Sequence, residues 1–400
     1  MTTPMVRLKA DTRWLVDRGW WLVGRMNASR TIVAAALLMA MTVFAAHLHA
    51  QQQNQPVAGP HVVPIRGNTY LIAGAGGNIT LSVGNDGVLM VDTGLAQNAD
   101  RVLATIQRLQ LDVQQRQLKE ADRTAIRMGA ETRSSIAGAN IPAALKPIRY
   151  IINTHVHPDH TGGNEKFRLS GRTFTGGNVA NDIRDAVEGA AILAHENVLV
   201  RMTQTGEGQQ PAPPDAQPTD TYYNDVMKMS HFFNGEGVQL VHVPKAHSDG
   251  DSLVVFRGSD VIATGDVYLT ESYPIIDVER GGTINGIVDA LNRIIDLSQP
   301  EFRTEGGTLV IPGHGRISDT ADVTFYRDMT VILRDRVQDM IKKGMTLDQI
   351  KNAKITADYE PRYGATSGFW TTDKFLEAMF TTLGGGQKPA APAAPARRRR

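Results

Sequence analysis

Three histidines and one aspartate lie within six positions of this chain, in the stretch THVHPDHTGGN at residues 154–164. The stretch follows an apolar run that is typical of a buried strand. Alternate side chains of an extended segment point the same way, so His155 and His157 would share one face. The proline that follows begins a turn, which would aim Asp159 and His160 at a neighbouring point. Neutral imidazoles and a carboxylate are ligands that suit zinc and similar cations, so the pattern indicates metal binding.

Further histidines and acids recur where later strands are expected to end, each beside a glycine that lets the backbone bend and approach a ligand closely. They are His247 in KAHSDGDS, Asp266 in TGD and His314 in PGHG. With the first stretch, the predicted ligands form two sets of three and a shared aspartate: His155, His157 and His247; Asp159, His160 and His314; and Asp266 between them. Three protein ligands per metal leave coordination positions open, which is typical of a catalytic rather than a structural site.

The rest of the chain contains the elements that must position these residues. Short β-type runs bounded by turn signals predict strands at 69–73, 78–83, 88–91, 148–153, 173–175, 191–193, 238–243, 252–256, 261–264 and 308–311. Helical patterns cover 98–109, 196–202, 283–297, 319–342, 347–353 and 372–383, and the polar segment 110–140 is expected to be a surface helix. Strands followed by helices, twice over, indicate an α/β protein whose sheets are covered by helices.

Composition excludes several classes of function. The 400 residues are 42% hydrophobic, enough for a substantial core, and the net charge of +1 offers no electrostatic basis for binding nucleic acid. The absence of cysteine excludes disulfides, thiolate metal sites and a cysteine nucleophile. A small-molecule substrate is therefore expected.

The N-terminus predicts export. The apolar run at 31–46 follows Arg25 and Arg30 and is shorter than the roughly 20 residues of a membrane-spanning helix. We interpret residues 1–50 as a signal peptide and its n-region, cleaved after Ala50, although Leu48 is not the small residue expected before the cleavage site. The protein would then be periplasmic or secreted, with no stable membrane anchor. A buried N-terminal helix or a retained anchor is the alternative, as is a start at Met26.

The motif His155-x-His157-x-Asp159-His160, followed by His247, Gly265-Asp266 and His314, resembles the metallo-β-lactamase superfamily. The resemblance covers roughly residues 65–320, and the order and spacing of the separated motifs make it highly specific. It implies a four-layer αβ/βα sandwich of two mixed sheets, with the metal site at one sheet edge. The expected organisation is a linker at 51–64, the metallo-β-lactamase-like domain at 65–320, a helical C-terminal extension at 321–383 and a disordered tail at 384–400.

Within that family, Asp92-Thr93-Gly94 resembles an early motif, which implies that Asp92 orients a metal ligand by hydrogen bonding; a plain turn residue is the alternative. Some true lactamases place a cysteine on the second metal, and this chain has none. Asp266 in the bridging place instead resembles glyoxalase-II-like and lactonase-like hydrolases. The stretches 194–198 and 246–252 resemble exported, mostly uncharacterised members.

Other histidines are expected to lie outside the metal site. His195 follows a strand and precedes a helix start, so we interpret it as a structural or substrate-pocket residue. His61, His231 and His242 lack an acidic or glycine context and are expected to be ordinary polar residues. The walls of the substrate pocket are expected from residues 204–235 and 268–273.

The predicted activity is metal-dependent hydrolysis. Two zinc ions, with iron or manganese as alternatives, would activate water near neutral pH for attack on an ester, thioester, lactone or amide bond, including a β-lactam. Asp159 would be the catalytic residue that holds the attacking water and shuttles a proton. One alternative is a di-iron or mono-iron oxidoreductase on the same fold. Another is a non-catalytic metal-binding domain, which has no physical reason to keep seven ligands with open coordination positions.

Overall fold

The computed structural model describes residues 59–127, 144–173, 189–204, 210–300 and 306–385. The predicted signal peptide at 1–50, most of the predicted linker at 51–64 and the tail beyond residue 385 lie outside these ranges. Among the residues that are described, no helix has both the length and the apolar character needed to cross a membrane.

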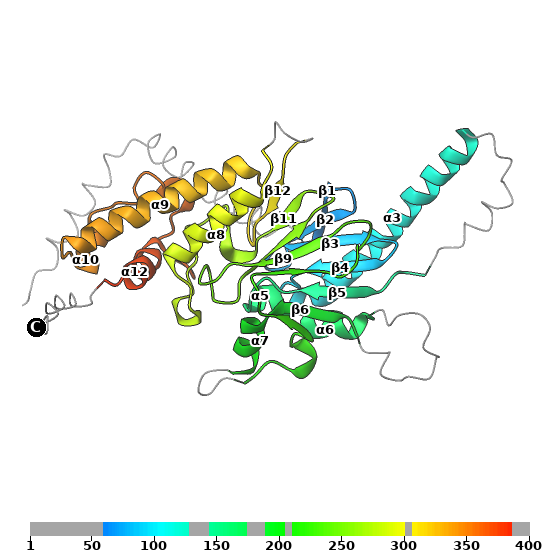
Figure 1. The fold of residues 1–400 in the computed structure, drawn as a ribbon, viewed down its shortest axis with the longest axis horizontal. Helices are drawn as coiled ribbons and strands as arrows, with labels where there is room; N and C mark the ends of the chain where they lie inside the picture. The colour runs from blue at the N-terminus through cyan, green and yellow to red at the C-terminus, as the bar shows by residue number, and fades with distance from the viewer. Residues whose placement is uncertain (1–58, 128–143, 174–188, 205–209, 301–305, 386–400) are drawn as a thin grey trace, which may run out of the picture. The chain divides into compact units, whose positions relative to one another are not determined.

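Two mixed sheets form the centre of the fold (Figure 1). The first has the strand order β1-β2-β3-β4-β5-β6-β7, with β1 (His61–Arg66), β2 (Thr69–Ala73), β3 (Ile79–Gly84), β4 (Gly87–Val91), β5 (Ile148–Ile152), β6 (Ala191–His195) and β7 (Asp220–Tyr222). The second has the order β12-β11-β10-β9-β8, with β8 (Val226–Lys228), β9 (Val238–His242), β10 (Ser252–Phe256), β11 (Val261–Ala263) and β12 (Leu309–Ile311). Strands β1 to β4 pair antiparallel and β4 to β7 parallel, while in the second sheet only the β11–β12 pair is parallel.

The helices flank these sheets. They are α3 (Ala99–Arg127), α5 (Pro158–Thr161), α6 (Asn164–Ser170), α7 (Glu196–Thr203), α8 (Ile284–Leu297), α9 (Thr320–Lys342), α10 (Leu347–Asn352), α11 (Glu360–Tyr363) and α12 (Thr372–Thr382). Short 3₁₀ helices are η2 (Ala96–Asn98), η4 (Pro214–Ala216), η5 (Gly265–Val267) and η6 (Val278–Arg280). Side-chain caps begin α8 and α9: Thr283 accepts from the backbone N–H of Gly286 at α8, and Asp319 accepts from that of Asp322 at α9.

Successive side chains of a strand point to opposite faces of its sheet, so each sheet packs against helices on one face and against the other sheet on the other face. In β4, Val88 and Met90 pack with residues of α3 on the outer face of the first sheet. Leu89 and Val91, which point the other way, pack between the sheets with Leu240 of β9. On the outer face of the second sheet, α8, α9 and α12 share one core with β9, β10 and β12. The structure therefore confirms the predicted αβ/βα sandwich and its C-terminal helices.

Some predicted elements differ from the observed ones. The helix predicted at 98–109 continues without a break through Arg127 as α3, because residues 110–127 are good helix formers despite their weak apolar pattern. β1 begins within the predicted linker; it contains Pro64, which an edge strand tolerates. β7 and β8 were not predicted, because their sequences, DTY and VMK, include polar residues, whereas the equally short β11 (VIA) and β12 (LVI) are apolar throughout. Of the strand predicted at 173–175, residue 173 is not in a strand and the other two lie outside the described residues.

The packing between the sheets yields a stability prediction. Leu240→Ala removes a fully buried side chain and should lower the free energy of unfolding by about 2–5 kcal/mol. Leu169→Ala is the matched control, because that leucine is 63% exposed and its loss should cost less than about 0.5 kcal/mol. Urea unfolding measures both variants, and equal losses would contradict the assignment of Leu240 to the inter-sheet core.

Candidate metal centre

Loops at the ends of four strands carry the seven predicted ligands. β5 leads into residues 154–160, where Pro158 occupies the first turn of α5 and its fixed φ suits a helix start. His247 follows β9, Asp266 lies in η5 after β11, and His314 follows β12. The two sheets thus bring residues that are far apart in the sequence to one edge of the sandwich.

Two glycines allow these loops to approach one another closely. Gly265 has a φ of +52°, and a Cβ at this position would lie 2.4 Å from Oγ1 of Thr154. A Cβ on Gly313 would lie 2.0 Å from Oδ1 of Asp266. Any larger residue at either position would push the ligand loops apart.

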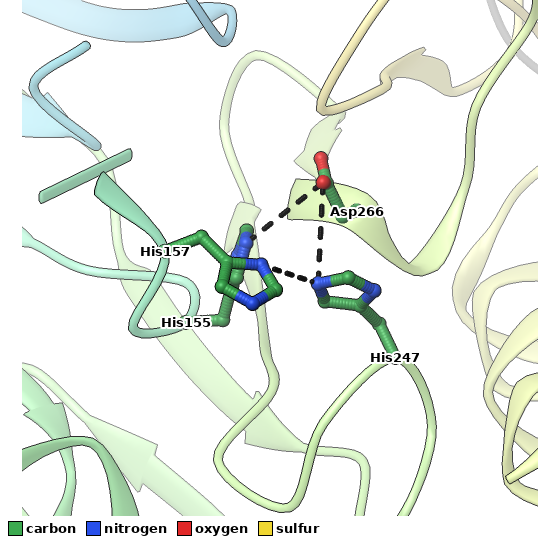
Figure 2. A group of neighbouring side chains, drawn as sticks. All are labelled: His155, His157, His247 and Asp266. Atoms are coloured by element: carbon green, nitrogen blue, oxygen red, sulfur yellow. Dashed lines mark hydrogen bonds and ion pairs between the residues drawn. The ribbon is translucent and has the colours of Figure 1, made fainter. Parts of the chain in front are cut away.

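The first group consists of His155, His157, His247 and Asp266, whose ligand atoms all lie within 4.8 Å of one another (Figure 2). Nδ1 of His157 is 2.9 Å from Nε2 of His247. Oδ2 of Asp266 is 3.9 Å from Nε2 of His155 and 4.0 Å from Nε2 of His247. Three nitrogens and one oxygen therefore converge on a single point.

The second group consists of Asp159, His160 and His314. Oδ2 of Asp159 lies 3.0 Å from Nε2 of His314 and 3.7 Å from Nε2 of His160. The other oxygen of Asp266, Oδ1, is 3.2 Å from Nε2 of His160 and 3.5 Å from Nε2 of His314. Asp266 thus presents one carboxylate oxygen to each group, in the position predicted between the two sets.

Unpaired atoms in these groups test whether metal ions fit. Nε2 of His155, Nε2 of His160 and Oδ1 of Asp266 are buried without a hydrogen-bond partner. Leaving a buried polar atom unpaired costs roughly 1–3 kcal/mol, more when it is charged. A cation coordinated by these atoms would remove that cost, and a histidine–carboxylate donor set suits borderline divalent metals. The two groups are consistent with a dinuclear metal site.

Asp92 and Thr154 hold two of the histidines from behind. Oδ2 of Asp92 accepts hydrogen bonds from Nδ1 of His160 and from Oγ1 of Thr154, both at 2.8 Å. The same Thr154 oxygen is 3.0 Å from Nδ1 of His155, placed to accept its proton. Asp92 adopts a left-handed φ of 63°, which is costly for a residue with a side chain and is kept where the surroundings enforce it. Asp92 therefore orients the ring of His160, a predicted ligand.

The loop that contains η6 holds the other two histidines of the first group. Nδ1 of His247 donates to the carbonyl of Ile275, and Nε2 of His157 lies 2.8 Å from Oδ2 of Asp277. Arg280 donates to the same Asp277 oxygen from Nη1 at 2.7 Å. An oxygen on the far nitrogen fixes the tautomer and ring orientation of a metal-binding histidine. Sequence reasoning missed Asp277, which follows no strand and has no neighbouring histidine.

The charges of Asp266 and Asp92 favour a positive charge at or near His160, which lies beside both carboxylates. Burial lowers the pKa of His155 well below its usual value and that of His247 to about 4. Burial also acts to lower the pKa of His160, but the carboxylates of Asp266 and Asp92 outweigh it and raise that pKa well above its usual value. Burial acts to raise the pKa of Asp266, yet the neighbouring histidines, His160 first, hold it well below its usual value. A proton on His160 or a metal ion can supply this charge, and the two compete.

His195 lies away from both groups. Its side chain is buried, and Nδ1 accepts from the backbone N–H of Asn197, which caps the start of α7. Its ring stacks on that of His242, with centroids 3.7 Å apart. Burial, followed by the charge of His242, lowers the pKa of His195 to about 4. These contacts give it a structural role at the end of β6.

A cavity of about 1040 Å³ opens on the more exposed side of the centre. The side chains of His157, Asp159 and His314 are 20%, 30% and 36% exposed, whereas those of the other four predicted ligands are at most 5% exposed. Residues 275–280 and 369–381 supply most of the remaining wall. The predicted wall at 268–273 contributes Leu269 and Ser272, but the described part of 204–235 contributes none, so that prediction is wrong there.

The chain is similar to known proteins in its sequence pattern and its fold. The metallo-beta-lactamase superfamily model matches residues 72–314. A double mutant of the sec-alkyl sulfatase PisA1 has a TM-score of 0.51 and 15% identity, covering 84% of this chain and 55% of that one. The stereoselective inverting sec-alkylsulfatase Pisa1 from Pseudomonas sp. has a TM-score of 0.48 and 14% identity, covering 82% of this chain and 51% of that one. A metallo-beta-lactamase from Pontibacter korlensis has a TM-score of 0.42 and 13% identity, covering 68% of this chain and 98% of that one.

At these identities the likeness concerns the fold alone. This chain spans about half the length of the two sulfatase structures, 55% and 51%. Among curated proteins no match was found.

The contact between Asp277 and His157 yields a prediction about metal affinity. Asp277→Asn removes the charge that fixes the far nitrogen of His157, and should weaken zinc binding roughly 10- to 100-fold. Titration against a competing chelator measures the stepwise affinities. Glu279→Gln, an exposed acid in the same loop, is the matched control and should bind as the unaltered protein does. Equal affinities in the two variants would show that Asp277 does not support the site.

Proposed function

The chain belongs to the metallo-beta-lactamase superfamily. We propose that it is a metal-dependent hydrolase that uses two zinc ions to cleave an ester, thioester, lactone or amide bond. His155, His157 and His247 would hold one ion and Asp159, His160 and His314 the other, with Asp266 shared.

One observation carries the proposal: two groups of ligand atoms share a buried carboxylate and open on one side to a cavity. A purely structural zinc is enclosed by four protein ligands. Here the ligands at the cavity are the partly exposed ones, so a substrate would meet the metals on that side. The absence of cysteine leaves histidine and aspartate as the ligand types, which also suit a hydrolytic zinc site.

When bound, the metal pair would lower the pKa of water and polarise the bond to be cleaved. The protein groups divide the remaining work. The buried pair His155 and His247 are neutral at pH 7, because burial lowers their pKa, and so each has a free nitrogen lone pair for coordination. Asp92 and Asp277 fix the rings of His160 and His157, so that little reorganisation accompanies the reaction.

Asp159 is the proposed proton carrier. It lines the cavity, and its carboxylate is partly exposed beside His314. Burial acts to raise its pKa, but the hydrogen bond with His314 lowers that pKa overall, so Asp159 is an ionised acceptor at neutral pH. It would accept a hydrogen bond from the attacking water, whose oxygen bonds to the carbonyl carbon. The proton would then pass to the leaving group as the old bond breaks.

Asp159→Asn tests this role. The amide cannot accept a proton, so kcat/KM should fall by about 100-fold or more, and the bound zinc should fall below two per chain. Zinc-loaded protein is assayed with β-lactams, thioesters, lactones, carboxylic esters and a sulfate ester, with metal content measured by mass spectrometry. Asp289→Asn, on the exposed face of α8, is the matched control. Unchanged hydrolysis and zinc content in Asp159→Asn would overturn the proposal.

The same metal analysis separates the proposal from redox chemistry. Iron as the resident metal, with a redox-active absorption spectrum and no hydrolysis across the panel, would favour an oxidoreductase on this fold. Zinc with hydrolysis of any member of the panel would favour the hydrolase.

We also propose export to the periplasm or the medium. The support is the apolar run at 31–46 after Arg25 and Arg30, which lies outside the described residues. N-terminal sequencing of protein from separated cell fractions should find Gln51 as the first residue in an exported fraction. A cytoplasmic protein that keeps Met1 or Met26 would contradict export.

A further inference from the structure

The cavity wall opposite the metal centre is built in part from residues that follow the part of the chain matched by the family model. That match ends at residue 314, whereas the wall includes Phe369, Trp370 and residues of α12. Resting on the proposed function, we infer that the substrate carries a medium or long acyl chain, and that this chain lies between α12 and residues 275–280.

The chemistry of the wall supports an apolar occupant. The lining between the metal ligands and the C-terminal helices is mainly aliphatic and aromatic, from Leu95, Ile275, Val278, Phe369, Trp370 and Ala378. Phe369 is 76% exposed and Val278 is 38% exposed. When an apolar ligand displaces the water between exposed apolar groups of one cavity, the free energy of the system falls, which favours binding.

The wall is anchored to the core, so it is a fixed surface. Phe375, Leu376 and Met379 of α12 are buried in the same cluster as α8 and α9. Trp370 and Ile275 pack against the edge of that cluster. A preformed apolar surface orders no chain segment when it binds, which favours affinity.

Four of the charged side chains of the wall, Asp277, Arg280, Lys374 and Glu377, are engaged with neighbouring groups. Arg280 pairs with Asp277 at 2.7 Å. Nζ of Lys374 donates to the carbonyl of Phe369 at 2.6 Å and lies 5.6 Å from the centroid of its ring, which holds the ring in place. Glu377 lies 3.9 Å from Lys351. The apolar surface is therefore the larger part of the wall left to recognise a ligand, beside the exposed acid Glu279 and the unpaired Nε1 of Trp370.

The size of the cavity selects among apolar groups. Pockets of about 300–1,000 Å³ bury drug-sized ligands, and this one, at about 1040 Å³, is at the upper end of that range. An acetyl group would leave most of it filled with water. The cavity is continuous from Asp159, Asp266 and His314 to Phe369, so a chain that starts at the reacting carbonyl can reach the apolar wall.

The kinetic test uses p-nitrophenyl esters with acyl chains of two to twelve carbons on zinc-loaded protein. Each added methylene should raise kcat/KM about fourfold until the wall is covered. Phe369→Ser should flatten this series by lowering kcat/KM for the long esters more than for the acetyl ester. Phe325→Ser, which alters an aromatic residue 49% exposed on α9 and outside the cavity, is the matched control. A series that is flat in the unaltered protein would overturn the inference.

A binding test separates this inference from the proposed hydrolysis. Trp370 is the only tryptophan after Trp21, so a full chain with Trp14→Phe, Trp20→Phe and Trp21→Phe reports on the wall alone. In metal-free protein, 2-dodecanone should shift the emission of Trp370 to the blue, 2-butanone should not, and Phe369→Ser should weaken the response. Binding without hydrolysis of any ester would support the inference and contradict the proposed function. Hydrolysis of the acetyl ester without binding of 2-dodecanone would support the proposed function and contradict the inference.

Discussion

The buried carboxylate of Asp266 is the point on which the centre depends. Its two oxygens face different groups: Oδ2 faces His155 and His247, and Oδ1 faces His160 and His314. Burying a charge is costly unless other charges or polar groups compensate for it. The histidines lower its pKa and so keep it ionised, but they leave Oδ1 without a hydrogen bond. A cation on each side of Asp266 would compensate for the charge and satisfy the unpaired atoms.

The sandwich brings together the four loops that surround this carboxylate, one of which carries Asp266 itself. Strand alternation divides the apolar side chains among three cores, and the two mixed sheets end at one edge. Small residues then permit the last approach, since side chains on Gly265 or Gly313 would collide with the site. Around the predicted ligands, Asp92, Thr154 and Asp277 orient the imidazoles. Rigid support of this kind is what holds catalytic groups in a productive geometry.

Much of the site was predictable because its chemistry is local in the sequence. Four ligand-type residues occur in the stretch 154–164, and the other three stand beside glycines at strand ends. The two groups found in the structure contain the predicted residues, although their role as ligands stays a prediction. Most strands and helices were also predictable from their apolar patterns, whereas β7 and β8 are short and contain polar residues.

The supporting shell and the cavity were not predictable in the same way. Asp277 meets His157 only through tertiary packing, across 120 positions of the sequence. The pattern at 372–383 predicted a helix but gave no sign that this helix faces the metal centre. The expected wall at 204–235 was wrong for its described part for the same reason. Contacts between distant segments depend on how the layers pack, which local patterns do not specify.

The most direct measurement of the central claim is a crystal structure of zinc-loaded protein with anomalous scattering recorded on both sides of the zinc absorption edge. The account predicts two zinc peaks about 3.5–4 Å apart, with the carboxylate of Asp266 between them. One group would surround each peak. A single peak, or zinc bound away from Asp266, would contradict it.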